Sequence, residues 1–502
     1  MAECFKTAYR MGIHREKVKG GKMAFEVRVW QKESMAHRSV TAIAAQSRAE
    51  DLISALGLPE ETVSLACAMI RDGEKAFTLY RLDGEARRRL TVILLGERRS
   101  RHMPEQDVFG LGKKLSDKCY DDDGAFVVAL DDGRVEAYEG ILGMIVRKSP
   151  EYSRKTEKPI QTHSHVVEMA LDIDAAGLCR LRAVARILPM TARLVDMPTM
   201  ELTTEDFSRF VFEEGARLGL EVREICGEDL RTQGFGGLYH VGKSGVKPPR
   251  LVVVQYRSKS PRHKIALVGK GLVYDTGGLC LKPRDHMATM KSDMGGAAAV
   301  FGAICMAAET SLDCDITAIL CMTENGIGPM ALRPDDIITL HSGLTVEINN
   351  TDAEGRLVLG DGVSYASREI VPDLIVDAAT LTGAQLMCTG KRHAGLLART
   401  EFLERAIVDA SMACGEPVFP MLYAPEMLLD EFKSDVADMK NSCKDRMNAQ
   451  SSCAGHFVEK HLSPDYQGAY AHIDIAGPAW DGERATGYGV LLLDAICRME
   501  RF

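Results

Sequence analysis

A buried β-strand is predicted by the stretch Ile265-Ala266-Leu267-Val268-Gly269-Lys270-Gly271, in which four apolar residues lead to a lysine between two glycines. Consecutive apolar residues are typical of strands that are covered on both faces, as in parallel sheets. Ligands of such sheets bind beyond the carboxyl ends of the strands, and glycine lets a ligand approach the backbone closely. Lys270, at the end of this predicted strand, is therefore a first candidate for a functional residue.

The sequence around this strand alternates strand patterns with helical patterns. Further strands are predicted at residues 251–254, 315–321 and 374–376, and helices at 295–308 and 357–367. Strands separated by helices predict a mixed, mostly parallel sheet that is flanked by helices on both faces. Carboxylate-rich stretches follow these strands, at the edge where binding is expected.

The first third of the chain predicts a separate α/β domain, because strand patterns alternate there with stretches that suit helices. These strand patterns lie at residues 25–30, 90–95 and 125–130. A polar segment at 152–163 marks the junction. We therefore expect an N-terminal α/β domain for packing and assembly at residues 1–172 and a larger catalytic domain at 173–502, which begins with a connecting helix at 175–194.

The composition describes a soluble globular protein, with 46% hydrophobic and 26% charged residues among 502. The net charge of -9 gives no overall attraction to nucleic acid or to an anionic membrane. No run of 18 apolar residues occurs, so no membrane-spanning segment is expected. The 14 cysteines include no C-x-x-C pair and are predicted to be free thiols in a reducing compartment. This prediction also applies to Cys443 and Cys453, which bracket a polar segment.

Residues 1–22 have a basic bias, with six lysines and arginines against two glutamates. Organellar transit peptides are basic and also rich in serine, and this segment contains no serine. A cytoplasmic location is therefore predicted, with organellar targeting as the alternative.

Two carboxylates and an arginine are concentrated at Asp352, Glu354 and Arg356. Alternate spacing would place the three side chains on one face of an extended segment. The apolar run 357–359 follows directly and would anchor this face to the core. An isolated pattern of this kind is more often a solvated turn with a surface salt bridge, so it needs support from elsewhere in the chain.

That support comes from Lys270, Asp275, Lys282 and Asp293, which add two carboxylates and two lysines to the candidate set. Carboxylates brought together raise one another's pKa values unless cations hold them, so either metal ions bind or the groups lie apart. Oxygen-rich ligand sets suit Mn²⁺ or Mg²⁺, and Zn²⁺ also accepts carboxylates. The sequence pattern alone leaves both arrangements open.

Other motifs have weaker support. The residues from Gly237 to Ser244 match the phosphate-loop pattern, but Pro248 and Pro249 follow too closely for the helix that such a loop requires. No H-E-x-x-H motif occurs among the thirteen histidines, which argues against the helix-borne zinc proteases. His472, next to Asp474, is predicted to be a packed core histidine rather than a ligand.

The strings VGKGLVYDTGGLCLKP (268–283), KSDMGGAAAV (291–300) and NNTDAEGRLVLGD (349–361) closely resemble the signatures of the leucyl aminopeptidase (cytosol aminopeptidase) family of dinuclear metallopeptidases. The resemblance covers about residues 190 to 502. Asp196 departs from it, because the family usually carries asparagine before Pro198.

The resemblance implies two divalent metal ions per chain, Zn²⁺, Mn²⁺ or both. Lys270, Asp275, Asp293 and Glu354 would bind the tighter ion, and Asp275, Asp352 and Glu354 the more exchangeable one. A lysine binds metal only as the neutral amine, and its usual pKa is about 10.4. The two ions would therefore have to lower the pKa of Lys270.

The function implied by the resemblance is removal of N-terminal amino acids, leucine and similar apolar residues preferred, from peptides with a free N-terminus. A hydroxide between the two ions would attack the scissile carbonyl, and Lys282 would stabilise the resulting oxyanion. Arg356 would hold a bicarbonate that shuttles protons. The family's first side-chain pocket corresponds to Met290, Thr380, Leu381 and Gly383. The family also implies a cytoplasmic homohexamer active in peptide catabolism, with neither a membrane nor nucleic acid as partner.

Two other classes of function stay open. A binding or regulatory protein with the same fold, including a DNA-associated one, would carry a basic surface stripe, which an acidic chain does not favour. A metal-dependent phosphoesterase would also use two cations, but such sites often recruit histidines, and none lies in the two main motifs.

Overall fold

The computed structural model describes residues 24–31, 35, 38–98, 100–157 and 163–502. The basic segment 1–22 lies outside the described residues, so the location inferred from it stays a prediction. Part of the polar segment 152–163 also lies outside them. Within the described ranges, none of the helices is both long enough and apolar enough to cross a bilayer.

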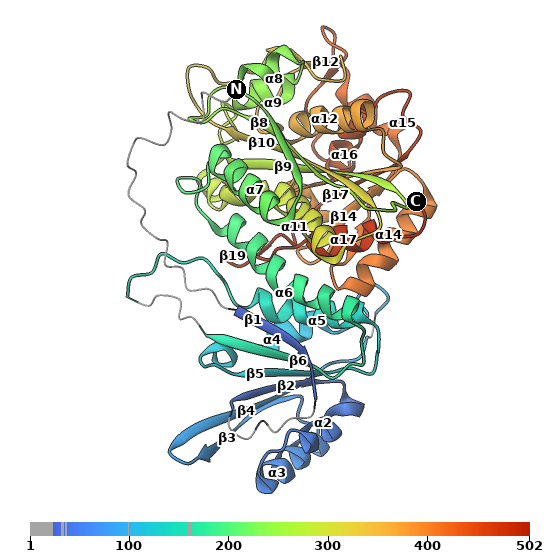
Figure 1. Cartoon of the computed structure of the whole chain (residues 1–502). Coiled ribbons are helices and arrows are strands. Elements are labelled where there is room, and N and C mark those ends of the chain that lie inside the picture. The colour runs from blue at the N-terminus through green and yellow to red at the C-terminus, as the bar shows by residue number, and fades with distance from the viewer. Residues whose placement is uncertain (1–23, 32–34, 36–37, 99, 158–162) are drawn as a thin grey trace.

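A six-stranded sheet forms the lower part of the molecule in Figure 1, in the order β1-β6-β5-β2-β4-β3. Neighbouring strands are parallel except for the hairpin of β3 and β4. The strands are β1 (Ala24–Val29), β2 (Val40–Ala44), β3 (Ala76–Asp83), β4 (Ala86–Leu94), β5 (Ala125–Ala129) and β6 (Ser164–Met169). The helices of this part are α2 (Ala49–Ala55), α3 (Glu60–Arg71), α4 (Val108–Lys114) and α5 (Val135–Arg147).

Alternation along the central strands explains why helices cover both faces of this sheet. In β5, Val127 packs into the cluster formed with α2 and α3, whereas Phe126 and Val128 pack into the cluster formed with α4 and α5. Successive side chains of a strand point to opposite faces, so the uninterrupted apolar pattern predicted two covered faces. The strands predicted at 25–30, 90–95 and 125–130 are confirmed as β1, β4 and β5.

His165 is an unusual member of the core of this sheet. Its side chain is fully buried among the rings of Phe25, Tyr120 and Phe126, and neither ring nitrogen has a hydrogen-bond partner among the described residues. Burial and the neighbouring His163 lower the pKa of His165 to about 4. The histidine is therefore neutral in the folded protein at pH 5, where an exposed histidine would be charged.

Replacing His165 with phenylalanine is expected to make the free energy of unfolding less sensitive to acid. Between pH 6.5 and pH 4 the unfolded chain binds a proton at this residue that the folded chain does not, so stability falls as the pH falls. From pH 7 to pH 5, wild type should lose about 2 kcal/mol of unfolding free energy relative to His165→Phe. Urea denaturation at both pH values measures this, with the exposed His286→Phe as a control. Parallel losses in wild type and His165→Phe would refute the assignment.

An eight-stranded sheet forms the larger, upper part, in the order β15-β14-β17-β13-β9-β10-β8-β7 (Figure 1). Its centre is parallel, because β13 pairs with both β17 and β9, and β9 pairs with β10. The strands are β7 (Glu221–Cys226), β8 (Arg250–Tyr256), β9 (Lys264–Asp275), β10 (Asp315–Asn325), β13 (Leu374–Ala379), β14 (Ala394–Ala398), β15 (Val418–Pro420) and β17 (Ala469–Asp474). Two small sheets consist of β11 (Ile337–Thr339), β12 (Thr345–Glu347) and β16 (Met439–Lys440), and of β18 (Trp480–Asp481) and β19 (Arg484–Ala485).

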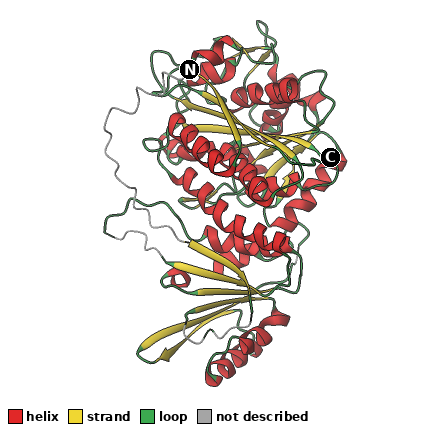
Figure 2. Ribbon diagram, viewed as in Figure 1, coloured by secondary structure: helices red, strands yellow, loops and turns green. Residues whose placement is uncertain are grey.

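Helices cover both faces of this sheet as well, as Figure 2 shows in red against yellow strands. In β9, Ile265 and Leu267 pack toward α6, α11 and α17, while Ala266 and Val268 pack toward α9, α12 and α16. The helices are α6 (Ala175–Asp196), α7 (Thr204–Leu218), α8 (Glu228–Thr232), α9 (Gly236–Gly242), α10 (Arg284–Met287), α11 (Gly295–Thr310), α12 (Gly355–Tyr365), α13 (Gly383–Cys388), α14 (Glu401–Cys414), α15 (Pro425–Leu428), α16 (Gln450–Lys460) and α17 (Val490–Cys497). The predicted class, a mixed and mostly parallel sheet flanked by helices, is confirmed.

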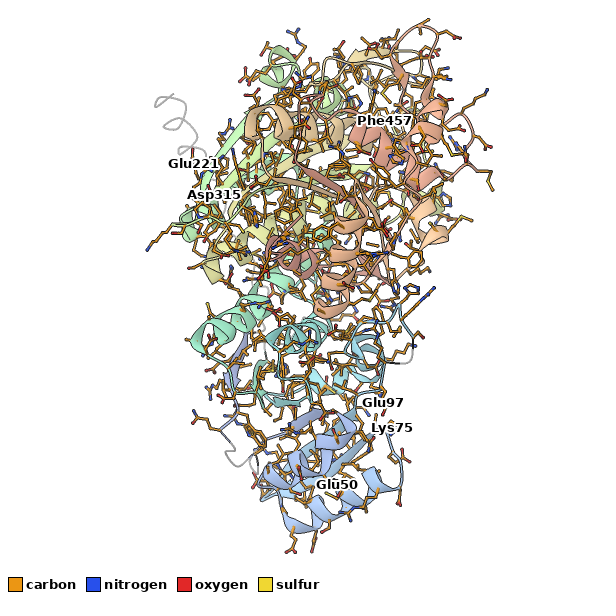
Figure 3. The ribbon with its side chains drawn as sticks, turned by 90° about the vertical axis from the view of Figure 1, so that its right-hand side faces the viewer. Glu50, Lys75, Glu97, Glu221, Asp315 and Phe457 are labelled. Carbon is orange, nitrogen blue, oxygen red and sulfur yellow. The ribbon has the colours of Figure 1, made fainter. Side chains whose placement is uncertain are left out.

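The two sheets share one continuous apolar core. Residues of α5 and α6, among them Ile141 and Leu188, belong to the same buried cluster as Val27 of the first sheet and Leu267 of the second. In Figure 3, Glu50, Lys75 and Glu97 mark the first sheet's part of the molecule, and Asp315 and Phe457 mark the second's. The division of the chain at residue 172 stays a prediction.

Candidate metal centre

The candidate residues come together where the parallel strands at the centre of the larger sheet end. Strand β9 carries both Lys270 and Asp275, so it continues past Lys270, and the prediction that Lys270 ends the strand is wrong. An extra residue in β9, Val273, shifts the register against β10 by one residue, which brings Asn325 opposite Asp275. Bulges are frequent next to functional sites because they re-aim side chains.

Lys270 is 2% exposed and lies among acceptors from three other segments. Its Nζ lies 2.8 Å from Asp293 Oδ2 and 3.2 Å from Glu354 Oε1, and it donates to the Thr380 backbone oxygen at 3.1 Å. Gly355 is required beside it, because a Cβ at that position would lie 2.6 Å from Lys270 Cε. Burial opposes the charge of Lys270, but Asp293 and Glu354 outweigh burial and hold its pKa above the usual range.

Lys282 forms a second bridge between carboxylates. Its Nζ lies 2.8 Å from Asp275 Oδ2 and 2.6 Å from Asp352 Oδ1. The other oxygen of Asp275 accepts hydrogen bonds from the Gly277 backbone N–H at 2.8 Å and from Asn325 Nδ2 at 3.0 Å. The predicted set of four carboxylates and two lysines is thus brought together, from segments that are up to 84 residues apart in sequence (270 to 354).

The donor set suits divalent cations. Carboxylate oxygens of Asp275, Asp293 and Glu354 all lie within 4.8 Å of one another, and all three residues are buried. Burial, together with the charge of Asp275, raises the pKa values of Glu354 and Asp293. Cations stabilise such a cluster of buried acids, and the ammonium groups of Lys270 and Lys282 offset part of its negative charge. An oxygen-rich set with one amine is compatible with Zn²⁺ or Mn²⁺.

The segment from Asp352 to Arg356 is not extended, and this part of the prediction is wrong. Glu354 has helical dihedral angles (φ -78°, ψ -33°), and α12 begins at Gly355. Arg356 therefore lies in the first turn of a helix, with Asp352 in the preceding turn.

Arg356 is buried, at 4% exposure, and it carries an unusual amount of unsatisfied hydrogen-bonding capacity. Its Nε and Nη1 have no hydrogen-bond partner among the described residues, and its guanidinium carbon lies 6.0 Å from the centre of the Phe432 ring. Burial lowers its pKa, yet a guanidinium stays charged at neutral pH. A buried cation with free donors fits a small planar anion such as bicarbonate.

Two asparagines that the sequence analysis missed hold these candidate ligands in place by hydrogen bonds. Asn325 Nδ2 also donates to the Thr351 backbone oxygen at 3.0 Å and to Glu354 Oε2 at 3.4 Å. Asn441 accepts from the backbone N–H groups of Asn349 and Asn350, and it donates to the backbone oxygens of Asn350 and Ala353. Neither asparagine lies in one of the motifs used in the sequence analysis. Asn325 is nevertheless the last residue of the apolar strand β10, the position that was expected for Lys270 in its own strand.

Asn325→Ala is expected to weaken Mn²⁺ binding about tenfold to a hundredfold, because residues that orient metal ligands contribute that much affinity. Calorimetric titration of Mn²⁺ into the metal-free protein measures it. Gln255→Ala is the matched control, because this amide lies on β8 and bonds Thr317 instead of a candidate ligand. Equal affinities in Asn325→Ala and wild type would show that Asn325 does not position the ligands.

Two of the four residues expected to bind the first side chain lie beside the same cluster, namely Thr380 and Met290. Thr380 Oγ1 donates to Asp293 Oδ1 at 2.8 Å, and Met290 lies in the same short 3₁₀ helix (Met290–Met294) as Asp293. Leu381 follows β13, and its backbone N–H donates to Asp474. Gly383 begins α13. Their role in substrate binding stays a prediction.

The motifs judged weaker on sequence have structural roles. Gly237 and Gly242 lie inside α9, which ends before Lys243, so no helix starts there as a phosphate loop requires. His472 is fully buried, and its Nδ1 lies 2.6 Å from Asp377 Oδ1, which confirms a core histidine. Cys443 and Cys453 are free thiols, as predicted. Asp196 is buried and bonds to Arg484 and to the Ala485 backbone, so it joins the end of α6 to β19.

Comparison with known proteins agrees with the resemblance seen in the motifs. The family model described as "Cytosol aminopeptidase family, catalytic domain" matches residues 189–493. The chain is 50% identical over 307 residues to the probable aminopeptidase NPEPL1 of Mus musculus and 45% identical to leucine aminopeptidase 1 of Caenorhabditis elegans. Each match covers 61% of this chain, but only 59% and 62% of these relatives' lengths.

A solved structure of similar fold extends the likeness to the N-terminal part. The apo leucyl aminopeptidase of Trypanosoma cruzi superposes with a TM-score of 0.88 at 38% identity, over 95% of this chain and 97% of that one. The first sheet, which carries no family motif in its sequence, is included in this match. Given a family model that spans most of the larger sheet and a whole-chain structural match, the chain belongs to the cytosol aminopeptidase family.

Proposed function

We propose that this protein is a metal-dependent aminopeptidase that removes N-terminal residues, leucine and similar apolar residues preferred, from peptides. The observation that carries the proposal is the buried cluster of Asp275, Asp293 and Glu354, whose carboxylate oxygens lie within 4.8 Å of one another. Lys270 lies between Asp293 and Glu354, and Lys282 lies between Asp275 and Asp352. Such a cluster is costly to fold and has no evident structural purpose, so it points to the binding of cations. Family membership supplies the reaction class.

Two divalent ions, Zn²⁺, Mn²⁺ or both, would be held by the candidate ligands. The tighter ion would take Lys270, Asp275, Asp293 and Glu354, and the exchangeable ion would take Asp275, Asp352 and Glu354. When bound, such ions polarise a carbonyl and lower the pKa of water so that a nucleophile forms at neutral pH. Asn325 would keep Asp275 and Glu354 oriented, since it donates to both.

Two cationic side chains would perform the remaining chemistry. Lys282, whose ammonium lies between Asp275 and Asp352, would stabilise the negative charge that develops on the scissile carbonyl oxygen. Arg356 would hold bicarbonate through its free Nε and Nη1, and that anion would relay protons to the leaving amine. Met290, Thr380, Leu381 and Gly383 would contact the first side chain of the substrate.

The substrate's free α-amine explains why such a site would trim chain ends. The free amine would be a ligand of one of the ions, whereas an acylated N-terminus delocalises its nitrogen lone pair into the amide and could not take that role. We further propose a cytoplasmic homohexamer with peptides as its substrates.

The test compares L-leucyl-p-nitroanilide with its N-acetylated form, using the full chain as purified, after chelation and after addition of Mn²⁺ or Zn²⁺. Turnover of the free-amine substrate that is lost on chelation, restored by metal and absent for the acetylated substrate would support the proposal. Phosphoester turnover of p-nitrophenyl phosphate would instead indicate the phosphoesterase alternative. A folded, metal-loaded chain with no turnover of any of these substrates would refute enzymatic function.

A further inference from the structure

Asp474 is a fully buried carboxylate that the proposed chemistry does not use. It is the last residue of β17, and in the parallel pairing of β17 with β13 it lies opposite Ala379, where β13 ends. Asp474 is therefore placed beside the loop 380–382, which leads from β13 to α13. Burying a carboxylate is costly unless hydrogen bonds compensate for the lost water, so its hydrogen bonds indicate what it holds.

Both oxygens of Asp474 accept hydrogen bonds from this loop. Oδ1 accepts from the Leu381 backbone N–H at 3.0 Å and from the Ala476 backbone N–H at 3.1 Å. Oδ2 accepts from Thr382 Oγ1 at 2.8 Å, and Thr382 Oγ1 accepts in turn from the Gln385 backbone N–H at 3.1 Å. One side chain thus holds two successive residues of the loop, Leu381 and Thr382.

The residue before Leu381 contacts two candidate metal ligands. The Thr380 backbone oxygen accepts from Lys270 Nζ at 3.1 Å, and Thr380 Oγ1 donates to Asp293 Oδ1 at 2.8 Å. Asp293 and Glu354, which also lie beside Lys270 Nζ, are themselves candidate ligands. The Thr380 oxygen would therefore remain the acceptor of the lysine when an ion is bound. An acceptor that fixes one N–H of a neutral amine also fixes the direction of its lone pair.

The Leu381 N–H and the Thr380 oxygen belong to the same peptide unit. This unit is planar and trans, so its N–H and its C=O point in opposite directions from one rigid plane. Asp474 accepts from the N–H, and the oxygen on the other side accepts from Lys270. A carboxylate that holds one edge of the plane therefore sets the direction of the opposite edge.

We propose that Asp474 is a positioning residue of the metal centre, which acts through the peptide unit of Thr380 and Leu381 on Lys270. Its bond to Thr382 keeps the same loop in place, so that Thr380 Oγ1 also stays directed at Asp293. The role rests on the proposed function, because it concerns the same metal ions.

The expected effects follow from the bonds that each variant removes. Asp474→Ala loses all three bonds and frees the peptide unit, so Mn²⁺ affinity should fall by about a hundredfold, the upper end of the usual effect of residues that orient ligands. Asp474→Asn keeps an oxygen for Leu381 and Ala476 but loses the acceptor for the Thr382 hydroxyl, so a loss of about tenfold is expected. Thr382→Val removes the same bond and should have the same effect.

A double variant tests whether the two residues act through one bond. Asp474→Asn combined with Thr382→Val should bind Mn²⁺ no more weakly than the weaker single variant, because effects that pass through a shared bond are not additive. Should Asp474→Ala fail to fold, Asp474→Asn and Thr382→Val provide the test.

The experiment titrates Mn²⁺ calorimetrically into the metal-free full chain and its variants, and it measures leucyl anilide hydrolysis separately. Asp361→Asn is the matched control, because Asp361 is also fully buried but accepts from the backbone N–H groups of Leu238 and His341 instead of the loop 380–382. Thermal unfolding should show a loss of stability in both Asp474→Asn and Asp361→Asn, whereas only Asp474→Asn should lose Mn²⁺ affinity.

Weaker Mn²⁺ binding by Asp474→Asn and Thr382→Val, with the affinity of Asp361→Asn unchanged, would support the proposal. Unchanged affinity in folded Asp474 and Thr382 variants would overturn it, as would an equal loss in Asp361→Asn. Mn²⁺ binding is measured without a substrate. If the affinity falls as expected in a chain that never hydrolyses peptides, the positioning role stands and the proposed function fails. A wild-type chain that binds no Mn²⁺ would overturn both.

Discussion

Replacement of Lys270 with arginine is expected to abolish binding of the tighter metal ion and, with it, peptide hydrolysis. A lysine can donate a lone pair once nearby dications lower its pKa, but a guanidinium does not lose its proton in proteins. The arginine would keep a positive charge among Asp275, Asp293 and Glu354, where it would repel an incoming cation. The arginine side chain is also larger than the lysine side chain, against which Gly355 already packs closely, so the site has little room for it. The metal content per chain after dialysis against Mn²⁺ or Zn²⁺ measures the effect.

A second substitution separates charge from size. Methionine in Lys270→Met has a similar length, no charge and no amine nitrogen, so this variant is also expected to lose the ion. Because the side chain is neither larger nor charged, the loss would be due to the missing nitrogen. Lys264→Arg is the matched control, because Lys264 begins the same strand and donates to the Ile370 backbone oxygen instead of a carboxylate. Circular dichroism checks that each variant is folded. Either Lys270 variant that retained both ions and full turnover would exclude Lys270 as a ligand.

The sequence predicted the core of the larger sheet well because burial on both faces leaves a direct trace in the residues. Runs such as 265–268 are apolar at every position, and the structure places Ile265 and Leu267 on one face and Ala266 and Val268 on the other. The conformation around Glu354 could not be predicted in this way. Alternate charges fit a strand and a helix start equally well over five residues. In the structure Gly355, the first residue of α12, packs against Lys270, and a local pattern contains no trace of this contact across 85 positions.

Asn325 and Asn441, which support the candidate ligands, could not be predicted for a similar physical reason. Asn325 meets Asp275 only because an extra residue in β9, Val273, shifts the register against β10 by one residue, and nothing in the local sequence marks that bulge. Asn441 meets the ligand segment because β16 pairs with β12, a contact across more than 90 residues. The candidate ligands could be named from their motifs, whereas the residues that orient them depend on long-range pairing that a single sequence does not reveal.

Substitution of Lys282 by methionine is expected to separate metal binding from catalysis. The Lys282 ammonium lies between Asp275 and Asp352. Burial lowers its pKa, but these carboxylates outweigh burial and hold the pKa above the usual range. This cation competes with metal ions for both carboxylates, so Lys282→Met should bind Mn²⁺ at least as tightly as wild type. Turnover should nevertheless fall by about a hundredfold to a thousandfold, the usual effect of removing a group that stabilises an oxyanion.

The decisive comparison is between the two lysines, because both bridge carboxylates and only one is expected to be a metal ligand. Lys282→Met should retain its metal and lose kcat, Lys270→Met should lose both, and Lys282→Arg should recover part of the rate because it keeps the charge. Lys243→Met, which removes a lysine bonded to His240 instead of a carboxylate, should change neither metal content nor kcat. If Lys282→Met instead lost its metal in parallel with Lys270→Met, Lys282 would belong to the ligand set, and the oxyanion role would have to pass to another group.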